Sequence, residues 1–413
     1  MSGNIKFLYW VIGIGLFVWV GCKNGRQEEH TLSDIIVIDL DSLEEADLLL
    51  SHHRVDSLRK FAFQGHVMTV ADGWPDSLRI IKLETSADCL LGAIKKIRFV
   101  DSLIFISDYN DHLYVFDSSG SFRNPIGELG RAPNQVVALS SFYVDRKRKV
   151  VGVYDGYSDC IHRYAFDGIK QDKISCRNEV NGYILDVNQI DDNEILLTLS
   201  SGVGDLYNYA VVSAKDYKLK EYILPYNLRY LENSSRGELS CLAQPNGQLW
   251  LTALLSDTIY EYKAGKMLSR FVVKSDCMSL NDRVFESHKE WISPAHASAF
   301  LRDNGYSQGL MAIGATDQYL QFDLSYKDTG YSVYYDYLNH KGYKSKQYSR
   351  GNVLMPGRFL TTTSDAFVSY VTAYDFIHQP EGCIDVDRPL WRDLRERTME
   401  DDNPILLLYY IRK

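Results

Sequence analysis

The chain has 413 residues, of which 45% are hydrophobic and 24% charged, and this composition excludes a disordered protein. Its formal net charge of −9 and its lack of long Lys/Arg runs argue against nucleic acid as a partner. The chain has 29 Tyr and 17 Phe. Because a tyrosine ring packs while its hydroxyl reaches water, this balance favours half-buried β-sheets.

Residues 1–22 have the pattern of a bacterial lipoprotein signal peptide. Lys6 precedes an apolar run from Phe7 to Val20, which is short for a membrane span and has the length of a signal-peptide core. Gly21-Cys22 then resembles a lipobox, although Trp19 stands where a lipobox usually has leucine. A plain secretory signal and a signal anchor are the alternatives. We expect Cys22 to be lipidated, which would hold the protein on a membrane without spanning it.

A polar tether and a single domain follow the signal peptide. Residues 23–31 are polar and should be solvated, and the domain covers 32–413. Ile35–Leu40 is its first strand candidate, and the spacing within 43–78 predicts an insertion with a short helix or a hairpin. Three histidines in this stretch lack further ligands at metal-binding spacing, so no metal site is predicted. These are His52, His53 and His66.

From residue 79 onward a unit of short strands recurs. The clearest echoes are Leu113–Gly120, Ile161–Gly168 and Ile259–Gly265. A period of about 40 to 50 residues made of strands predicts the blades of a β-propeller.

Each of the first two echoes ends in a turn with Asp and Gly, as Asp-x-x-Gly at 117–120 and as Asp-Gly at 167–168. Asp117 and Asp167 can accept backbone N–H bonds there, and the glycine can take the positive φ that closes the turn. We therefore predict that both acids form turns and have no catalytic role.

Apolar and polar residues also alternate in the rest of the chain. Together these patterns predict an all-β, six-bladed β-propeller of four-stranded antiparallel sheets. Residues 279–309 lack this repeated strand pattern, which predicts a second insertion with a helix there. The terminal apolar run Ile405–Ile411 is what ring closure needs, because a last blade built from both chain ends leaves no open edge. Ile35–Leu40 is the expected partner strand.

Five stretches resemble the six-bladed β-propeller lipoproteins of Bacteroides and relatives, which are similar to NHL-repeat and TolB-like propellers. They are VIDLDS (37–42), IIKLET (80–85), LYVFDSSGSF (113–122), IGELGRAPNQ (126–135) and DNPILLLYYIRK (402–413). The resemblance implies this fold and a place in the cell envelope, as an outer-membrane lipoprotein facing the periplasm or the cell surface. It implies no particular reaction.

The loop 126–135 departs from the glycine-rich inter-blade loop of that family. Glycines and a proline match at 127, 130 and 133, but Ala, Asn, Gln and Val replace Gly, Gly, Glu and Tyr at 132 and 134–136. A remade loop is the place where we expect a ligand. The predicted binding residues are Gly127, Gly130, Arg131, Asn134 and Gln135.

Two functions fit this sequence, and the first is favoured. One is a monomeric binding scaffold for an envelope protein or for a glycan or peptide ligand, with no cofactor. The other is a hydrolase or lyase, which should bring titratable side chains from several blades to the central channel. The candidates for that role are Asp108, Asp155, His162, His296 and Asp365.

Other sequence signals are weaker. Residues 305–309 spell G-x-S-x-G, but no strand precedes the serine and no helix follows it, so we predict a loop. The six cysteines after Cys22 contain no Cys-x-x-Cys pair, and we expect at most one disulfide. Aromatic residues near turns could stack on sugars or bind peptides, although most should pack between blades. They are Trp74, Tyr154, Tyr157, Tyr226, Tyr230, Trp291 and Trp391.

Overall fold

The structure, a computed structural model, describes most of the region from residue 35 to residue 410. The described ranges are 35–45, 60–63, 66–69, 77–132, 135–177, 179–199, 207–225, 242–243, 249–253, 256–263, 265–275, 300–307, 309–326, 329–346, 359–378 and 389–410. The predicted signal peptide, Cys22 and the tether lie outside them. Residues 35–413 form one compact unit. Within the described ranges, no helix has both the length and the apolar character needed to cross a membrane.

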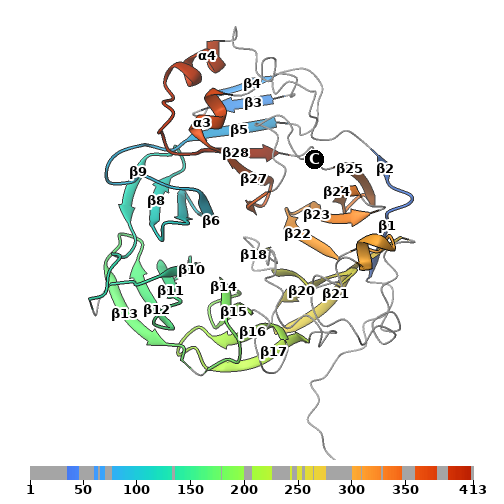
Figure 1. The fold of residues 1–413 in the computed structure, drawn as a ribbon, viewed down its shortest axis with the longest axis horizontal. Coiled ribbons are helices and arrows are strands. Elements are labelled where there is room, and N and C mark those ends of the chain that lie inside the picture. Colours follow the sequence, from blue (N-terminus) through green and yellow to red (C-terminus); the bar gives the residue numbers. More distant parts are fainter. Residues whose placement is uncertain are drawn as a thin grey trace, which may run out of the picture. The chain divides into compact units, whose positions relative to one another are not determined.

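Six sheets follow one another around a ring, which confirms the predicted six-bladed propeller (Figure 1). Blade 1 contains β6 (Ile94–Val100), β7 (Leu103–Asp108), β8 (Leu113–Asp117) and β9 (Phe122–Pro125). Blade 2 contains β10 (Leu139–Asp145), β11 (Val150–Asp155), β12 (Cys160–Ala165) and β13 (Lys170–Ser175). Blade 3 contains β14 (Ile184–Gln189), β15 (Glu194–Leu199), β16 (Tyr207–Ser213) and β17 (Leu219–Pro225).

The other three blades have additional strands at their outer edges. Blade 4 contains β18 (Leu242–Ala243), β19 (Leu249–Thr252), β20 (Thr258–Lys263) and β21 (Lys266–Lys274). Blade 5 contains β22 (Leu310–Ala315), β23 (Tyr319–Tyr326), β24 (Thr329–Asp336) and β25 (Lys341–Lys346). Blade 6 contains β26 (Thr361–Thr362), β27 (Ala366–Val371), β28 (Ile405–Tyr410) and β5 (Ser77–Lys82).

The core consists of apolar layers between neighbouring blades. Because each blade is covered on both faces, its middle strands are near-continuous apolar runs, and all six residues of β11 are buried. Phe105 of blade 1 and Phe142 of blade 2 belong to one buried cluster, while Trp250 of blade 4 and Val333 of blade 5 belong to another. Burial at about 25 cal/mol per Å² makes these layers the main stabilising contribution.

The turns at Asp117 and Asp167 form as predicted. The Oδ1 atom of Asp117 accepts the backbone N–H groups of Ser119 and Ser121, at 2.8 and 3.1 Å. Gly120 has a φ of 91°, and a Cβ at that position would lie 2.3 Å from the backbone oxygen of Lys82. Asp167 accepts the N–H of Ile169 in the equivalent turn of blade 2. Both aspartates therefore have a structural role.

The antiparallel order gives the ring two distinct faces. Turns from the first to the second strand of a blade, and from the third to the fourth, lie on one face, which we call the turn face. Turns from the second to the third strand lie on the opposite face together with the connections between blades, and we call it the loop face.

Strands from both ends of the chain close the ring, but the N-terminal one differs from our prediction. β28 pairs antiparallel with β5, which places Leu407 opposite Ile80. The expected partner, Ile35–Leu40, was wrong: β1 (Ile36–Asp39) instead runs parallel to β21 in blade 4. The physical reason is burial. β28 is covered on both faces, and its neighbour must offer adjacent buried residues such as Ile80 and Ile81, whereas in β1 only Ile38 is buried.

The segment before β5 adds outer strands to three successive blades. β1 extends blade 4, and β2 (Glu44–Glu45) pairs parallel with β25 of blade 5. β3 (Lys60–Phe63) pairs parallel with β5 of blade 6 and forms an antiparallel hairpin with β4 (His66–Thr69). A hairpin was one of the two alternatives expected in the 43–78 insertion, and most of its expected helix lies outside the described residues.

Within the described ranges, short helices occur at two places. α3 (Ala373–Ile377) and α4 (Pro389–Glu396) lie between β27 and β28, on the loop face. Thr372 caps α3, because its side chain accepts the backbone N–H of Asp375. In the insertion expected at 279–309, Phe300–Asp303 form one helical turn, and residues 276–299 lie outside the described ranges.

Candidate functional site

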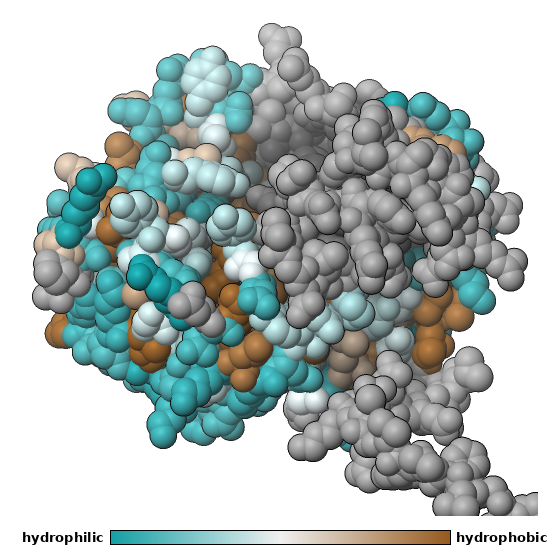
Figure 2. Space-filling view, turned by 60° about the horizontal axis from the view of Figure 1, so that its bottom comes forward, coloured by the Kyte–Doolittle hydropathy of each residue, from teal (hydrophilic) through white to brown (hydrophobic). Residues whose placement is uncertain are grey.

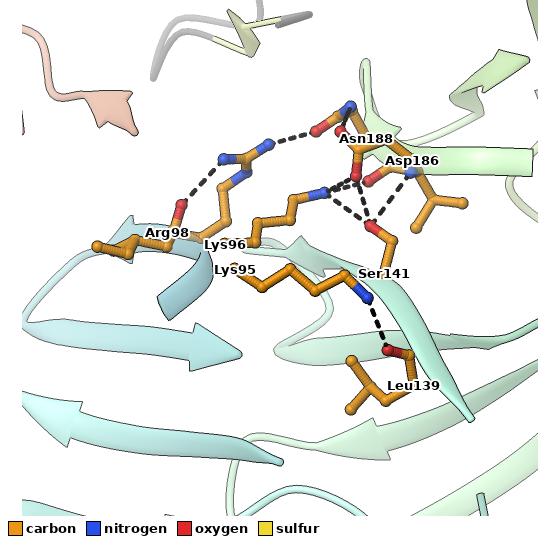
Figure 3. Close-up of polar contacts among 9 residues, drawn as sticks. Lys95, Lys96, Arg98, Leu139, Ser141, Asp186 and Asn188 are labelled. Carbon is orange, nitrogen blue, oxygen red and sulfur yellow. Dashed lines mark hydrogen bonds and ion pairs between the residues drawn. The ribbon is translucent and has the colours of Figure 1, made fainter. Parts of the chain in front are cut away.

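The first strands of blades 1, 2 and 3 carry a polar network on the wall of the central channel (Figure 3). The Lys96 ammonium of β6 lies 2.6 Å from the Oδ1 atom of Asp186 and donates to the backbone oxygen of Val187 at 2.7 Å, both in β14. It also donates to the Ser141 hydroxyl of β10 at 3.1 Å. A lysine of blade 1 is thus bonded directly to blade 3, past blade 2.

Further hydrogen bonds hold this network together. Ser141 donates its hydroxyl hydrogen to Asp186, and the Nδ2 atom of Asn188 donates to the other oxygen of that carboxylate at 2.8 Å. Arg98 donates to the Oδ1 atom of Asn188 and to the backbone oxygen of Ile97. These bonds tie three inner strands together, so the channel wall is a cross-linked surface on this side.

The charges of the network fix the ionisation of Asp186. Burial would raise the pKa of its carboxyl, but the positive charges of Lys96 and Arg98 and the hydrogen bonds from Lys96 and Ser141 outweigh burial and hold that pKa below its ordinary value. The neighbouring Lys95, which donates to the backbone oxygen of Leu139, has a pKa lowered by burial. Lys96, Arg98 and Asp186 are thus charged groups that their hydrogen bonds hold in position.

A cavity of about 820 Å³ opens on the turn face beside this network. Its walls come from blades 6, 1, 2 and 3, and we call it the mouth cavity. Its lining includes both apolar and hydrogen-bonding side chains. The lining residues used below are Arg98, Phe99, Asp101, Val144, Asp145, Arg146, Lys147, Gln189, Asp192, Thr363, Asp365 and Leu408.

Ion pairs surround the mouth cavity. Arg146 lies 2.6 Å from Asp101, joining the turns of blades 2 and 1, and Lys147 pairs with Asp192 of blade 3. Most of these side chains are exposed, so each pair contributes little to stability. The rim of the cavity therefore carries both positive and negative side chains, which can form ion pairs with a partner that carries both kinds of charge.

Asp108 and Asp155, which we considered as channel acids, serve as anchors for turns instead. Asp108 is fully buried at the end of β7 and accepts the backbone N–H groups of Gly92, Asn110 and His112. Asp155 has the same place in blade 2, and accepts the N–H groups of Val137, Ala138, Tyr157 and Ser158. Both carboxylates lie at the loop face, where they tie a turn to the connection that enters their blade.

The other three channel candidates have different outcomes. His162 is fully buried in β12, the third strand of blade 2, with its Nδ1 atom 3.1 Å from the Lys170 ammonium and its Nε2 atom 3.7 Å from Asp155. Asp365 is exposed in the turn after β26, where it accepts the hydroxyl hydrogen of Thr363. His296 lies outside the described residues.

The predicted binding loop is held mainly by its own bonds. The side-chain oxygen of Gln135 accepts the N–H of Ala132 at 3.0 Å and covers Gly130. Gly127 lies against the ring of Tyr164, in the wall of a shallow cavity of about 660 Å³. Arg131 is exposed, and Asn134 lies outside the described residues. Of the predicted binding residues that the structure describes, Arg131 is the exposed one, and Glu128, Leu129 and Ala132 of the same loop are exposed as well.

The weaker sequence signals have structural explanations. Ser307 is buried and its hydroxyl accepts the N–H of Gly309, just before β22, so the order of elements is the reverse of a nucleophile elbow. Cys89, Cys160 and Cys176 are buried and unpaired with one another, and the remaining cysteines lie outside the described residues. In the described part of the chain no group of three or more His, Cys, Asp or Glu side chains could hold a metal ion.

Sequence reasoning did not single out the channel network. The signal was present in two first strands, which carry polar residues two positions apart: Lys96 and Arg98 in β6, and Asp186 and Asn188 in β14. Polar residues on one face of a first strand indicate a channel wall. Which of them bond to each other depends on the packing of blades that are 90 residues apart.

Solved structures of two Bacteroides proteins are among those that share this fold. One is a protein of Bacteroides fragilis NCTC 9343, named as a candidate exported protein, with a TM-score of 0.65, 18% identity, and coverage of 92% of this chain and 100% of that one. The other is a member of the DUF4221 family from Bacteroides vulgatus ATCC 8482, with a TM-score of 0.51, 10% identity, and coverage of 81% and 96%. At these identities the likeness concerns the fold alone.

A family model matches most of the chain. It is described as "Domain of unknown function (DUF4934)" and covers residues 68–410, from the β3–β4 hairpin to the end of β28. No curated protein matches the sequence.

Proposed function

The chain belongs to the DUF4934 family, and we propose that it is a lipid-anchored binding protein of the cell envelope whose mouth cavity holds a segment of a protein partner. The location is supported by the signal-peptide pattern that ends at Cys22 and by the likeness to a protein named as a candidate exported protein. The binding role is supported by the mouth cavity.

The composition of the mouth cavity favours a polypeptide. Its apolar wall residues, such as Phe99, Val144 and Leu408, can receive side chains, while the Oε1 atom of Gln189, which has no hydrogen-bond partner among the described residues, can accept from a peptide backbone. A volume of about 820 Å³ fits a few residues and would leave the rest of the partner outside, against the rim of paired charges.

Site-specific photocrosslinking tests this role. A photoreactive phenylalanine at Lys147, on the rim of the mouth cavity, should crosslink a discrete partner in cell envelopes, whereas the same group at Lys173, exposed on the outer strand of blade 2, should not. Equal products at both positions, or none at Lys147, would overturn the proposal.

The membrane anchor has its own test. Radiolabelled palmitate should be incorporated into the full chain and should be lost in Cys22→Ala, which would also leave the membrane fraction. Labelling that persists in this variant would contradict lipidation at Cys22. It would not bear on the proposed binding of a protein segment in the mouth cavity, which the crosslinking tests.

A further inference from the structure

A second cavity lies between the outer strands of blades 1 and 2, and we call it the outer cavity. It is the shallow cavity of about 660 Å³ beside the predicted binding loop, and its volume lies within the range of about 300–1,000 Å³ that small-molecule sites have. It shares no described residue with the mouth cavity. The lining residues that carry the argument are Gly127, Glu128, Tyr164, Lys170 and Lys173.

A β-bulge in blade 2 gathers four polar side chains on one face of the β12–β13 pair. Tyr164 lies opposite Lys170 and His162 opposite Lys173, with an extra residue, Gln171, in β13 between these pairs. Residues opposite each other share a face of the sheet, as do residues two positions apart in a strand. Accordingly, the Lys170 ammonium lies 3.1 Å from the Nδ1 atom of His162. Because Tyr164 packs in the layer between blades 1 and 2, this face is the one toward blade 1.

The Tyr164 hydroxyl is a buried donor without an acceptor. Tyr164 is 3% exposed, and its Oη atom has no hydrogen-bond partner among the described residues. A Cβ at Gly127 would lie 3.2 Å from that atom, so any other residue at 127 would crowd the hydroxyl. A buried hydroxyl without a partner destabilises the fold, and this one lines the outer cavity. An acceptor group supplied from the cavity would satisfy it.

Charges of both signs surround the hydroxyl. Burial, and then the negative charges of Asp155 and Glu128, raise the pKa of Tyr164 to about 12, so the hydroxyl keeps its proton and can donate it. Burial, and then the positive charge of Lys173, lower the pKa of Lys170. Neither Glu128 nor Lys173 forms an ion pair with any residue that the structure describes. Two opposite charges therefore remain on the cavity wall for a ligand.

The other two acids in the cavity lining are already engaged. Asp172 pairs with Arg163, and these two residues lie opposite each other on the other face of the β12–β13 pair. Asp167 accepts the backbone N–H of Ile169 in its turn. Glu128 is therefore the carboxylate best placed to bind a positive group of a ligand.

We propose that the outer cavity binds a small zwitterion, of the size of an amino acid or a dipeptide, a role beyond that proposed for the mouth cavity. The Tyr164 hydroxyl and the lysine ammonium groups bind its carboxylate, and Glu128 binds its ammonium group. A ligand with one sign of charge would leave either Lys173 or Glu128 without a partner. On the face drawn in Figure 2 the described surface is mainly hydrophilic, with apolar residues in small groups, which suits a polar ligand.

Isothermal titration calorimetry of the purified full chain tests the proposal. The common amino acids and the dipeptide dialanine, each titrated separately, should show saturable binding in at least one case. Acetylating the amino group of that compound, or converting its carboxylate to the amide, should weaken binding about 10-fold or more, because each change removes one charge that the cavity binds. The proposal is overturned if none of these compounds binds, or if both modified forms bind as tightly as the parent.

Two tyrosine variants of blade 2 locate the site. Tyr164→Phe should weaken binding about 10-fold and should not lower the melting temperature without ligand, because the hydroxyl that it removes has no partner. Tyr154 is the matched control, since it packs in the layer between blades 2 and 3 and its hydroxyl donates to Asp159 at 3.0 Å. Tyr154→Phe should lower the melting temperature and leave binding unchanged.

Two outcomes with these variants contradict the proposed site. Wild-type affinity in Tyr164→Phe would place the ligand elsewhere. A lower melting temperature of Tyr164→Phe without ligand would mean that its hydroxyl is bonded within the fold. Neither outcome bears on crosslinking at Lys147, because the two cavities are lined by different residues, so this inference and the mouth-cavity proposal can fail independently.

Discussion

His162 has no access to solvent, and its environment opposes protonation. Burial, and then the positive charges of Lys170 and Lys173, lower its pKa from 6.5 to about 4, although Asp155 acts in the opposite direction. In the unfolded chain the imidazole titrates near its ordinary value. Between these two values the unfolded state therefore binds a proton that the folded state does not.

We expect His162 to make the protein less stable in mild acid. Its neutral form is compatible with the fold above about pH 6.5, and stability should fall by up to about 1.4 kcal/mol for each pH unit below that, until the pH reaches the folded pKa. Urea unfolding at pH 7 and pH 5 should show a smaller loss for His162→Gln than for the wild type. From pH 7 to pH 8 the free energy of unfolding should change equally in the two proteins. Equal losses between pH 7 and pH 5 would contradict this account.

Lys96 should be important for stability because its partners depend on it. Lys96→Met keeps most of the side-chain volume but leaves Asp186 and the oxygen of Val187 without their ammonium donor, which should lower the free energy of unfolding by about 1–3 kcal/mol. Lys147→Met removes a rim ion pair whose lysine is exposed and should cost less than about 0.5 kcal/mol.

A double-mutant cycle in urea denaturation separates this effect from lost packing. Lys96→Met combined with Asp186→Asn should cost less than the sum of the two single changes, because the second change removes the charge that the first leaves unpaired. Additive costs would show that Lys96 and Asp186 stabilise the fold independently.

At the scale of elements, β1 shows how an outer strand becomes part of the core. Ile38 is completely buried in the layer between blades 4 and 5, whereas the adjacent Val37 is 46% exposed. Ile38→Ala should lower the free energy of unfolding by about 2–5 kcal/mol, and Val37→Ala should change it by less than about 0.5 kcal/mol. Chemical denaturation of both variants provides the comparison. Equal small effects would mean that β1 is only loosely attached to blade 4.

The elements that local sequence determines were predicted well. The turns after Phe116 and Phe166 were recognisable because Asp and Gly satisfy a local backbone requirement, and the strands beside them followed from alternation. The partner of β28 was not predictable in this way. Both Ile36–Asp39 and Ser77–Lys82 are extended and apolar, and their different burial is decided by contacts with residues hundreds of positions later.

The candidate site was predicted less well than the fold. Asp108 and Asp155 were reasonable channel acids by residue type, but the sequence does not reveal that backbone N–H groups already occupy their carboxylates. The same holds for the predicted binding loop: the sequence does not reveal that the Gln135 side chain bonds to Ala132 within the loop. Tyr157 was recognised as a residue near a turn, but its exposure of 73% in the turn between β11 and β12 becomes visible only in the fold.

The whole molecule should unfold as one unit, because its last blade contains both early and late parts of the chain. Leu407 of β28 is buried opposite Ile80 of β5, and Leu407→Ala should lower stability by about 2–5 kcal/mol. Far-UV circular dichroism and tryptophan fluorescence should give coincident unfolding curves, and this change should shift both midpoints equally. If only one of the two midpoints moved, blade 6 would be unfolding separately from the rest.

The outer strands of blades 4 to 6 also determine the order in which the chain can assemble. Blades 1 to 3 are built from strands that are consecutive in sequence, so each can form soon after its residues are synthesised. β1 must await residues 266–274, and β5 has to wait for residues 405–410. Such distant pairings slow folding because a long loop must close first. β1 and β5 are therefore synthesised early but join their sheets late.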